Sequence, residues 1–266
     1  MSGLSVVLAT YNEEENLGPC LDSVKDISDE IVVVDGLSQD RTVEIAKRYH
    51  AKVKVTTNKP IFHINKQMAI DMATKDWVFQ LDADERVTAE LAKEIKEEIG
   101  NWKLPASQRG EEIGNSRVNG YWIPRKNWFL GRFLTKGGQY PDYTLRLYRR
   151  GKGRLPQKSV HEQAVVEGKV GYLKNPLIHI ADPTFARYLK RFDRYANLIS
   201  NELKEKKIGY NPIMAIKYLL VLPIRWFVLT YIRHKGFMDS WQGFVFSLFS
   251  SLRFPVGYFK FIIHNS

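Results

Sequence analysis

The first hundred residues alternate short strand-like runs with stretches of helical periodicity, and this alternation constrains the fold more than any other feature of the chain. Leu4–Thr10 and Trp77–Leu81 are apolar runs of strand length, and residues 30–34 and 52–56 continue the series. Between them, residues 13–25, 38–49 and 64–74 carry apolar side chains at helical spacing. Strands and helices in this order predict an α/β fold whose mostly parallel, Rossmann-like sheet has helices on both faces.

The remainder of the chain up to residue 207 predicts further strands and helices of the same domain. We expect a helix at 90–99, an exposed loop at 103–118 and a long basic helix at 184–207. Further strands are expected at 121–125, 144–149, 169–173 and 177–180. We therefore expect one α/β domain over residues 1–207 and a separate helical region over residues 208–266.

Two long apolar segments set the last part of the chain apart. Residues 213–232 are interrupted by Lys217, Pro223 and Arg225, and residues 244–263 by Arg253, Pro255 and Lys260. Each segment has about the 20 residues that a membrane-spanning helix needs. Charge and proline near the middle favour amphipathic helices in the membrane interface, or a hairpin that enters one leaflet. Amphipathic helices that simply cover the domain are the alternative.

The charge of the chain is uneven and indicates an anionic partner for its second part. The net charge is +11, but residues 1–100 hold 12 Lys and Arg against 19 Asp and Glu, whereas residues 101–266 hold 28 against 10. Nucleic acid, anionic lipid and a phosphorylated substrate all fit a basic region. Because the basic residues lie among long apolar runs, we expect an anionic membrane surface as the partner, and no nucleic acid.

The single cysteine and the first residues suggest a cytoplasmic protein. Cys20 has no partner for an internal disulfide, and a lone thiol fits a reducing compartment. It is interpreted as a packed thiol rather than a catalytic one. The first ten residues lack the basic and apolar regions of a signal peptide. With the apolar segments, this predicts a location at the inner face of the cell membrane.

Polar residues follow three of the expected strands. Asp82 and Asp84, in Asp82-Ala83-Asp84, come directly after Trp77–Leu81, and two such carboxylates can share Mg²⁺ or Mn²⁺ and a hydroxylated ligand. Asp35 ends the second strand, where it could accept hydrogen bonds from a base or ribose. Ligands bind beyond the carboxyl ends of parallel strands, so these carboxylates are expected to share one site.

Each of these residues also has a purely structural interpretation. The acidic triplet could be a solvated turn. Ser38 and Asp40 look better placed than Asp35 to cap the next helix, which would leave Asp35 free for a ligand. Thr10, Tyr11, Asn12 and Glu13 could form the floor of a nucleotide pocket, or a plain turn between strand and helix.

Three ordered blocks resemble the family 2 glycosyltransferases. They are Ser-Val-Val-Leu-Ala-Thr-Tyr-Asn-Glu-Glu, Ile-Val-Val-Val-Asp-Gly-Leu-Ser-Gln-Asp-Arg-Thr and Asp-Trp-Val-Phe-Gln-Leu-Asp-Ala-Asp-Glu-Arg. The resemblance implies the GT-A fold, a nucleoside-diphosphate (NDP) sugar donor, a divalent metal and inversion at the anomeric carbon. It implies that Asp35 binds the nucleobase, Asp82, next to Ala83, the ribose or donor sugar, Asp84 the metal, and Lys66 the diphosphate. A solvated helix lysine is the alternative for Lys66.

The second half resembles a narrower branch, the lipopolysaccharide core glucosyltransferases and their relatives. Tyr-Pro-Asp-Tyr-Thr-Leu-Arg-Leu-Tyr-Arg-Arg, Val-His-Glu, Leu-Ile-His and Arg-His-Lys-Gly-Phe-Met-Asp-Ser-Trp-Gln-Gly-Phe carry this looser match. The branch implies work at a membrane on a lipid-linked or cell-envelope saccharide. By resemblance alone, UDP is the expected nucleotide.

Inverting transfer needs a base that removes the proton of the acceptor hydroxyl. Glu162 is the first candidate and Asp142 the second, although Glu162 could instead form a salt bridge with a nearby cation. His179 and His161 are candidate metal ligands, with a structural role as the alternative. Arg146, Arg149 and Arg150 are interpreted as a basic strip for phosphate, or in part as a solvated strand edge.

The sequence therefore predicts an inverting, metal-dependent glycosyltransferase that uses Mg²⁺ or Mn²⁺. Two other classes remain open: a non-catalytic membrane-associated nucleotide-binding scaffold, and a nucleic-acid-binding protein. A nucleotidyltransferase would normally have a Gly-rich phosphate loop after the first strand, which residues 10–18 do not offer.

Overall fold

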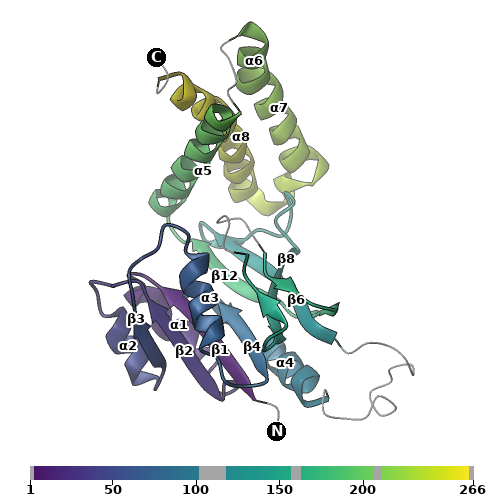
Figure 1. Cartoon of the computed structure of the whole chain (residues 1–266). Coiled ribbons are helices and arrows are strands. Elements are labelled where there is room, and N and C mark those ends of the chain that lie inside the picture. Colours follow the sequence, from purple (N-terminus) through teal and green to yellow (C-terminus); the bar gives the residue numbers. More distant parts are fainter. Residues whose placement is uncertain (1–2, 102–117, 157–162, 207–210, 264–266) are drawn as a thin grey trace. The chain divides into compact units, whose positions relative to one another are not determined.

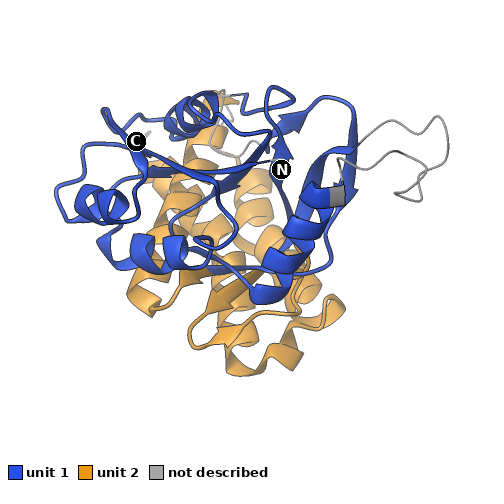
Figure 2. Cartoon of the chain, turned by 90° about the horizontal axis from the view of Figure 1, so that it is seen from below, with its two compact units in different colours: residues 1–125, 143–179 blue, residues 126–142, 180–266 orange. Residues whose placement is uncertain are grey.

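The computed structural model describes residues 3–101, 118–156, 163–206 and 211–263. The chain forms two compact units: unit 1 comprises residues 1–125 and 143–179, and unit 2 comprises residues 126–142 and 180–266 (Figure 2). Each unit is described by itself.

A mixed sheet organises unit 1 (Figure 1). The strand order is β3-β2-β1-β4-β8-β6-β12-β5, and β11 pairs with β6. β1, β2, β3 and β4 are mutually parallel, whereas β8 runs antiparallel to β4. The strands are β1 (Leu4–Thr10), β2 (Glu30–Asp35), β3 (Lys52–Val55), β4 (Trp77–Leu81), β5 (Glu85–Val87), β6 (Val118–Phe129), β8 (Asp142–Arg149), β11 (Lys169–Tyr172) and β12 (Leu177–Asp182), and a small second sheet pairs β9 (Gly153–Arg154) with β10 (Val165–Val166).

Alternate residues of the central strands feed two separate cores. On one face Val6, Leu8 and Val33 pack with apolar residues of α1 (Glu14–Asp22) and α4 (Ala89–Asn101). On the other, Val7 and Val32 pack with residues of α3 (His63–Asp71). Because side chains alternate along a strand, strands buried on both faces must be apolar throughout, as β1 and β2 are. α2 (Thr42–Arg48) connects β2 to β3.

The predicted order of strands and helices in the first hundred residues is confirmed, with boundaries that shift by a few residues. The predicted loop at 103–118 lies almost wholly outside the described residues. No local pattern predicted β5, whose three residues are Glu85, Arg86 and Val87. Cys20 is buried, as expected for a packed thiol, and burial raises its pKa.

Unit 2 is mainly helical. After α5 (Phe185–Glu205), a long helical stretch from Pro212 to Arg233 contains α6 (Pro212–Ile216), α7 (Leu222–Phe227) and two wider π-helical turns, η2 (Lys217–Val221) and η3 (Val228–Arg233). A short turn, η4 (Gly236–Asp239), leads into α8 (Ser240–Ile263), which packs against α5 and α7. The last residues of β6 pair with β7 (Arg132–Phe133).

The expected domain boundary after residue 207 does not separate the compact units. α5 belongs with the later helices because its apolar side packs on α8, where Gly257 lies against Ala196 and Ile199. Residues 126–142 also belong to unit 2, a long-range association that no local sequence pattern reports.

Gly257 should be required for the close packing of α5 and α8. A Cβ atom there would lie 2.8 Å from the carbonyl oxygen of Ala196 and 2.8 Å from Cβ of Ile199. We expect Gly257→Val to destabilise unit 2 by about 1–3 kcal/mol through overpacking. Thermal unfolding followed by circular dichroism measures this. Gly100→Ala is the matched control, because a Cβ there meets nothing within 4 Å; equal effects of both variants would contradict the prediction.

Candidate active site

The carboxyl ends of β1, β2 and β4 bring the predicted residues to one edge of the sheet. β1 lies between β2 and β4 and is parallel to both, so Thr10, Asp35 and Asp82 follow neighbouring strands. The register confirms this placement, since Thr10 is opposite Asp35 and Leu8 is opposite Leu81.

Asp82 is held between two cations. Its Oδ1 forms an ion pair with Nζ of Lys66 on α3, and its Oδ2 lies 2.6 Å from Nη2 of Arg146 on β8. Burial acts to raise the pKa of Asp82, but Arg146 and Lys66 outweigh it and hold that pKa well below the usual range. Burial lowers the pKa of Lys66, an effect that Asp82 opposes. Asp82 is therefore an ionised anchor for both cations.

Glu85 extends this charge network into the interior. Its side chain is fully buried, with Oε1 at 2.9 Å from Nη2 of Arg146 and 3.5 Å from Nη1 of Arg125. Its Oε2 accepts a hydrogen bond of 2.9 Å from the backbone N–H of Asp82. Glu85 was not among the predicted site residues, although an acidic residue directly after an Asp-x-Asp triplet was a visible signal.

Asp84 and His179 approach each other on the other side of the triplet. β12 pairs antiparallel with β5, which sets His179 opposite Glu85 and places its Nε2 3.6 Å from Oδ2 of Asp84. Carboxylate oxygen and imidazole nitrogen are donors that small divalent cations accept. Among the described residues no cluster of three or more His, Cys, Asp and Glu side chains forms a metal-binding group.

Asp35 is not free, which corrects the interpretation of Ser38 as a helix cap. The Asp35 side chain is fully buried and accepts hydrogen bonds from the Ser38 N–H at 2.8 Å, the Ser38 hydroxyl at 2.6 Å and the Thr10 hydroxyl at 3.0 Å. A carboxylate that turns back onto the N–H groups of its own loop stabilises that loop. Because the Asp35 side chain is 0% exposed, direct contact with a nucleobase would require the loop that covers it to move.

The loops after β1 and β2 are joined by hydrogen bonds. The Asn12 N–H donates to Oγ of Ser38 at 2.9 Å, and Oδ1 of Asn12 accepts from the Gln39 N–H at 2.8 Å. The Glu13 N–H donates to Oγ1 of Thr42 at 2.8 Å. This arrangement leaves the side chain of Tyr11 exposed at 44%. An exposed aromatic ring over a fixed floor is suited to stacking against a planar base.

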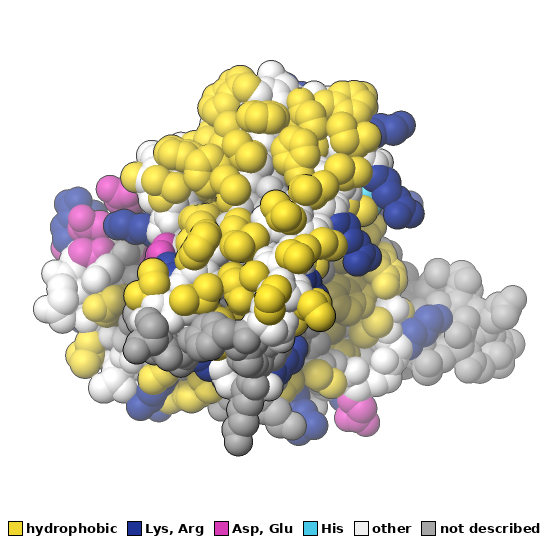
Figure 3. Space-filling view, turned by 90° about the horizontal axis from the view of Figure 1, so that it is seen from above, with side chains coloured by type: hydrophobic (Ala, Val, Ile, Leu, Met, Phe, Trp, Pro, Cys, Tyr) yellow, Lys and Arg dark blue, Asp and Glu magenta, His cyan; other side chains and the backbone are white. Residues whose placement is uncertain are grey.

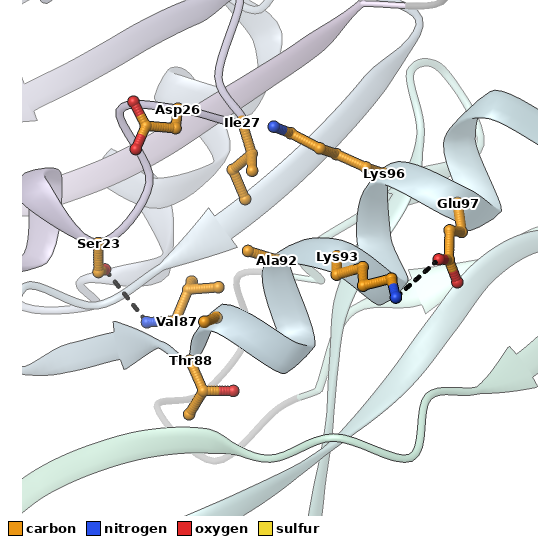
Figure 4. Close-up of a pocket in the computed structure, with 10 residues that line it drawn as sticks. Ser23, Asp26, Ile27, Val87, Thr88, Ala92, Lys93, Lys96 and Glu97 are labelled. Carbon is orange, nitrogen blue, oxygen red and sulfur yellow. Dashed lines mark hydrogen bonds and ion pairs between the residues drawn. The ribbon is translucent and has the colours of Figure 1, made fainter.

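A cationic cavity of about 170 Å³ adjoins Asp82. Lys66, Arg125 and Arg146 line it, together with Phe62, Gln80 and Thr144. A larger cavity of about 540 Å³ lies between α4 and the turn after α1 (Figure 4). Its surface groups pair locally, as Lys93 does with Glu97, and it contains none of the predicted site residues. The smaller cavity is therefore the one that belongs to the candidate site.

The predicted basic strip of Arg146, Arg149 and Arg150 is wrong as a single surface. β8 runs antiparallel to β4, so Arg149 lies opposite Trp77 at the start of β4, far along the strand from Asp82. Arg150 donates to the carbonyl oxygen of Lys75 at 3.0 Å. Arg146 alone reaches the site, and its guanidinium binds carboxylates of the protein.

Neither base candidate belongs to the described part of unit 1. Glu162 lies outside the described residues, and so does His161. Asp142 begins β8 and belongs to unit 2, where its Oδ2 accepts a hydrogen bond of 3.3 Å from Nδ2 of Asn127.

Comparison with known proteins identifies relatives of this chain. Residues 5–154 match the family model described as glycosyl transferase family 2. The lipopolysaccharide core biosynthesis glycosyltransferase LpsC of Rhizobium meliloti (strain 1021) is 28% identical, over 94% of this chain and 91% of that protein. An uncharacterized glycosyltransferase of Rickettsia typhi (strain ATCC VR-144 / Wilmington) is 27% identical, over 96% of this chain and 85% of that protein.

Among solved structures, a mannosyltransferase from Pyrobaculum calidifontis has a TM-score of 0.51 at 14% identity. The similarity covers 100% of this chain and 88% of the mannosyltransferase chain. The mannosyltransferase structure was solved in complex with GDP-Man and Mn²⁺. At this identity the likeness shows the fold, which is the predicted GT-A fold.

Arg146 should be the residue on which the charge network depends. Arg146→Gln leaves Glu85 buried with one cation fewer and Asp82 with Lys66 alone. We expect a loss of about 3 kcal/mol or more in the free energy of unfolding, because removing one partner strands a buried charge. Urea unfolding measures it. The control Arg150→Gln, at the far end of β8, should cost under about 1 kcal/mol; similar losses would refute a central role for Arg146.

Proposed function

This chain belongs to glycosyl transferase family 2, and from that premise we propose that it transfers a sugar from a UDP-sugar, with inversion, to a hydroxyl group of a lipid-linked or cell-envelope saccharide. The observation that carries the proposal is the edge of the sheet where Asp84 faces His179 and Asp82 lies between Lys66 and Arg146. The relative named for lipopolysaccharide core biosynthesis supports the class of acceptor.

The donor nucleotide would bind over the loops after β1 and β2. Tyr11 offers an exposed ring for the base, while Thr10, Asn12 and Glu13 fix the loop beneath it through the hydrogen bonds described above. Asp35 then acts by holding this floor. Lys66 is the cation that we assign to the diphosphate, because it lines the cavity next to Asp82. Asp82 and the neighbouring Ala83 would lie against the ribose or donor sugar, and Arg146 would hold Asp82 in place.

Asp84 and His179 fit a divalent cation, Mg²⁺ or Mn²⁺. Their donor atoms are 3.6 Å apart, close to the separation of two neighbouring ligands of one small cation. A metal bound there would supply positive charge to the diphosphate as it leaves. The remaining ligands would be diphosphate oxygens and water, consistent with two protein donors.

The transfer itself needs one proton movement. The acceptor oxygen attacks the anomeric carbon from the face opposite the diphosphate, its proton passes to a carboxylate base, and the bond from carbon to the diphosphate oxygen breaks. We assign the base to Glu162, with Asp142 as the second candidate. Such a base contributes roughly 10²–10⁴-fold to the rate.

We also propose that the enzyme acts at the cytoplasmic face of the membrane, where an anionic surface holds its helices and no nucleic acid takes part. The basic and apolar composition of residues 211–263 supports this location.

The metal assignment can be tested by thermal shift of the whole protein with UDP, GDP, CMP and TDP, each with and without Mn²⁺. We expect UDP with Mn²⁺ to stabilise the protein, by about 2.7 kcal/mol at 100 times its dissociation constant. Asp84→Ala and His179→Ala should lose the metal-dependent part, and the control Asp26→Ala should keep it. A metal-dependent shift of normal size in both site variants would sink the assignment, and no shift with any nucleotide would favour a scaffold.

The base can be identified by comparing Glu162→Gln with Asp142→Asn. We expect Glu162→Gln to reduce the transfer rate about 100-fold or more while the nucleotide-dependent thermal shift stays the same. Asp142→Asn should have a smaller effect. A full transfer rate in Glu162→Gln would move the role to Asp142 or to another residue.

A further inference from the structure

The long helical stretch of unit 2 is apolar on its exposed side as well as on its packed side. Its exposed side chains recur at helical spacing and are large. Within residues 212–233 an 18-residue window has a mean hydropathy of 1.7, and 11% of that window is buried within the protein. A helix that is apolar all round normally lies in a core or in a membrane. The exposed apolar residues are Ile213, Ile216, Leu220, Val221, Ile224, Val228 and Ile232.

The charged residues of this region are almost all cations. Residues 211–263 contain six Lys and Arg and a single acid, Asp239, which is 1% exposed. Lys217 and Arg225 lie on the exposed side of the long stretch itself. Figure 3 shows apolar side chains gathered on this face of the molecule, with Lys and Arg at its margin. An apolar surface edged by cations complements the headgroup layer of an anionic bilayer.

Residues 233–244 continue this surface and are called the junction below. They comprise the end of η3, the turn that contains η4, and the first residues of α8. Phe237, Met238, Trp241 and Phe244 are between 43% and 56% exposed there. Large exposed apolar patches mark contact sites rather than ordinary surface. Aromatic residues beside cations are typical of the membrane interface, where rings sit at headgroup level.

Asp239 binds this junction to residues 130–137. Its carboxylate accepts hydrogen bonds from the Thr135 N–H at 2.9 Å, the Thr135 hydroxyl at 3.0 Å and the Lys136 N–H at 2.7 Å. The Gly137 N–H donates to the carbonyl oxygen of His234 at 2.9 Å, and Nε2 of Gln242 donates to that of Leu130 at 3.2 Å. A buried carboxylate used in this way joins two segments that are distant in the sequence.

We propose that unit 2 docks on an anionic bilayer, and that the exposed apolar side of residues 212–233 and the junction insert into it. Through its hydrogen bonds, Asp239 couples this docking to segment 126–142. That segment ends in Asp142, the second candidate for the base that deprotonates the acceptor. Docking would therefore hold this segment at the surface where a lipid-linked saccharide is presented. This last consequence rests on the proposed function; the docking specifies the membrane location proposed above and does not depend on the transfer reaction.

The module lies in the interface rather than across the bilayer. Lys217 and Arg225 point outward from the stretch that would cross, and a charge at the centre of the bilayer is costly. In the interface their long side chains can place the charge among headgroups while the stems stay in apolar surroundings.

Docking is tested by co-sedimentation of the whole protein with phosphatidylcholine vesicles, with and without phosphatidylglycerol. We expect binding only with phosphatidylglycerol, release by alkaline carbonate, and a roughly tenfold or greater loss of affinity in the double variant Phe237→Ser, Trp241→Ser. Lys217→Gln and Arg225→Gln should each weaken binding about fivefold at low salt. Tyr172→Ser, which alters a 63% exposed aromatic residue of unit 1, is the matched control and should bind normally.

Three results would overturn docking in this form. One is a wild-type protein that co-sediments with neither kind of vesicle. Another is retention after carbonate, which would show a spanning helix. The third is a dimer in solution that the double variant converts to a monomer, which would show that a second copy covers the face. If vesicles fail while UDP with Mn²⁺ still shifts the melting temperature, the docking is wrong and the proposed function stands; the reverse pattern refutes the function and keeps the docking.

The coupling is tested by hydrogen exchange. We expect anionic vesicles to slow exchange in peptides from 213–232 and also in peptides from 130–137. Thr135→Val removes one hydrogen bond to Asp239 with little risk to folding, and Asp239→Asn removes an acceptor; both should reduce the slowing at 130–137 and leave it at 213–232. Unchanged exchange at 130–137 in the wild type, or slowing that persists in both variants, would refute the coupling.

Discussion

Asp82 holds Lys66 and Arg146 on opposite sides of one carboxylate, and the edge of the sheet depends on these ion pairs. The three residues come from the end of β4, from α3 and from β8, so the pairs join a strand, a helix and an antiparallel strand. Buried charges are tolerated only when they are matched, and Glu85 completes the matching of Arg146. Asp82 and Glu85 are thus paired with Lys66 and Arg146. Asp84, the second acid of the triplet, faces His179 instead.

The two units differ in how completely their apolar residues are covered. In unit 1 the apolar residues of β1, β2 and β4 are covered by helices on both faces of the sheet. In unit 2 the long helical stretch covers α8 with one side and leaves equally apolar residues on the other. Exposed apolar surface of this extent is unfavourable in water, and cations surround it; these two properties are the basis of the proposed docking on an anionic bilayer.

Much of the fold could be read from local patterns, whereas the roles of single polar residues could not. The apolar runs located β1, β2 and β4 because a strand buried on both faces has to be apolar throughout. Ser38 was interpreted as a helix cap, but it donates to Asp35, since the loop after β2 folds back on the strand end. Arg149 and Arg150 were grouped with Arg146, but the antiparallel direction of β8 carries them to the far end of β4.

By itself, the sequence determined the order of strands and helices along the first hundred residues, and it determined the family. It also located the polar residues that follow the strands. These properties depend on periodicity and on short contiguous blocks of sequence. Only the tertiary structure decided which charges meet. His179 reaches Asp84 through the pairing of β12 with β5, in which His179 lies opposite Glu85 although the two residues are 94 positions apart in the chain (179 − 85). Asp239 reaches Thr135 across 104 positions. Such contacts follow from topology, and no local pattern encodes them, since the free energy that selects them is that of burying matched charge and apolar surface in one packed structure.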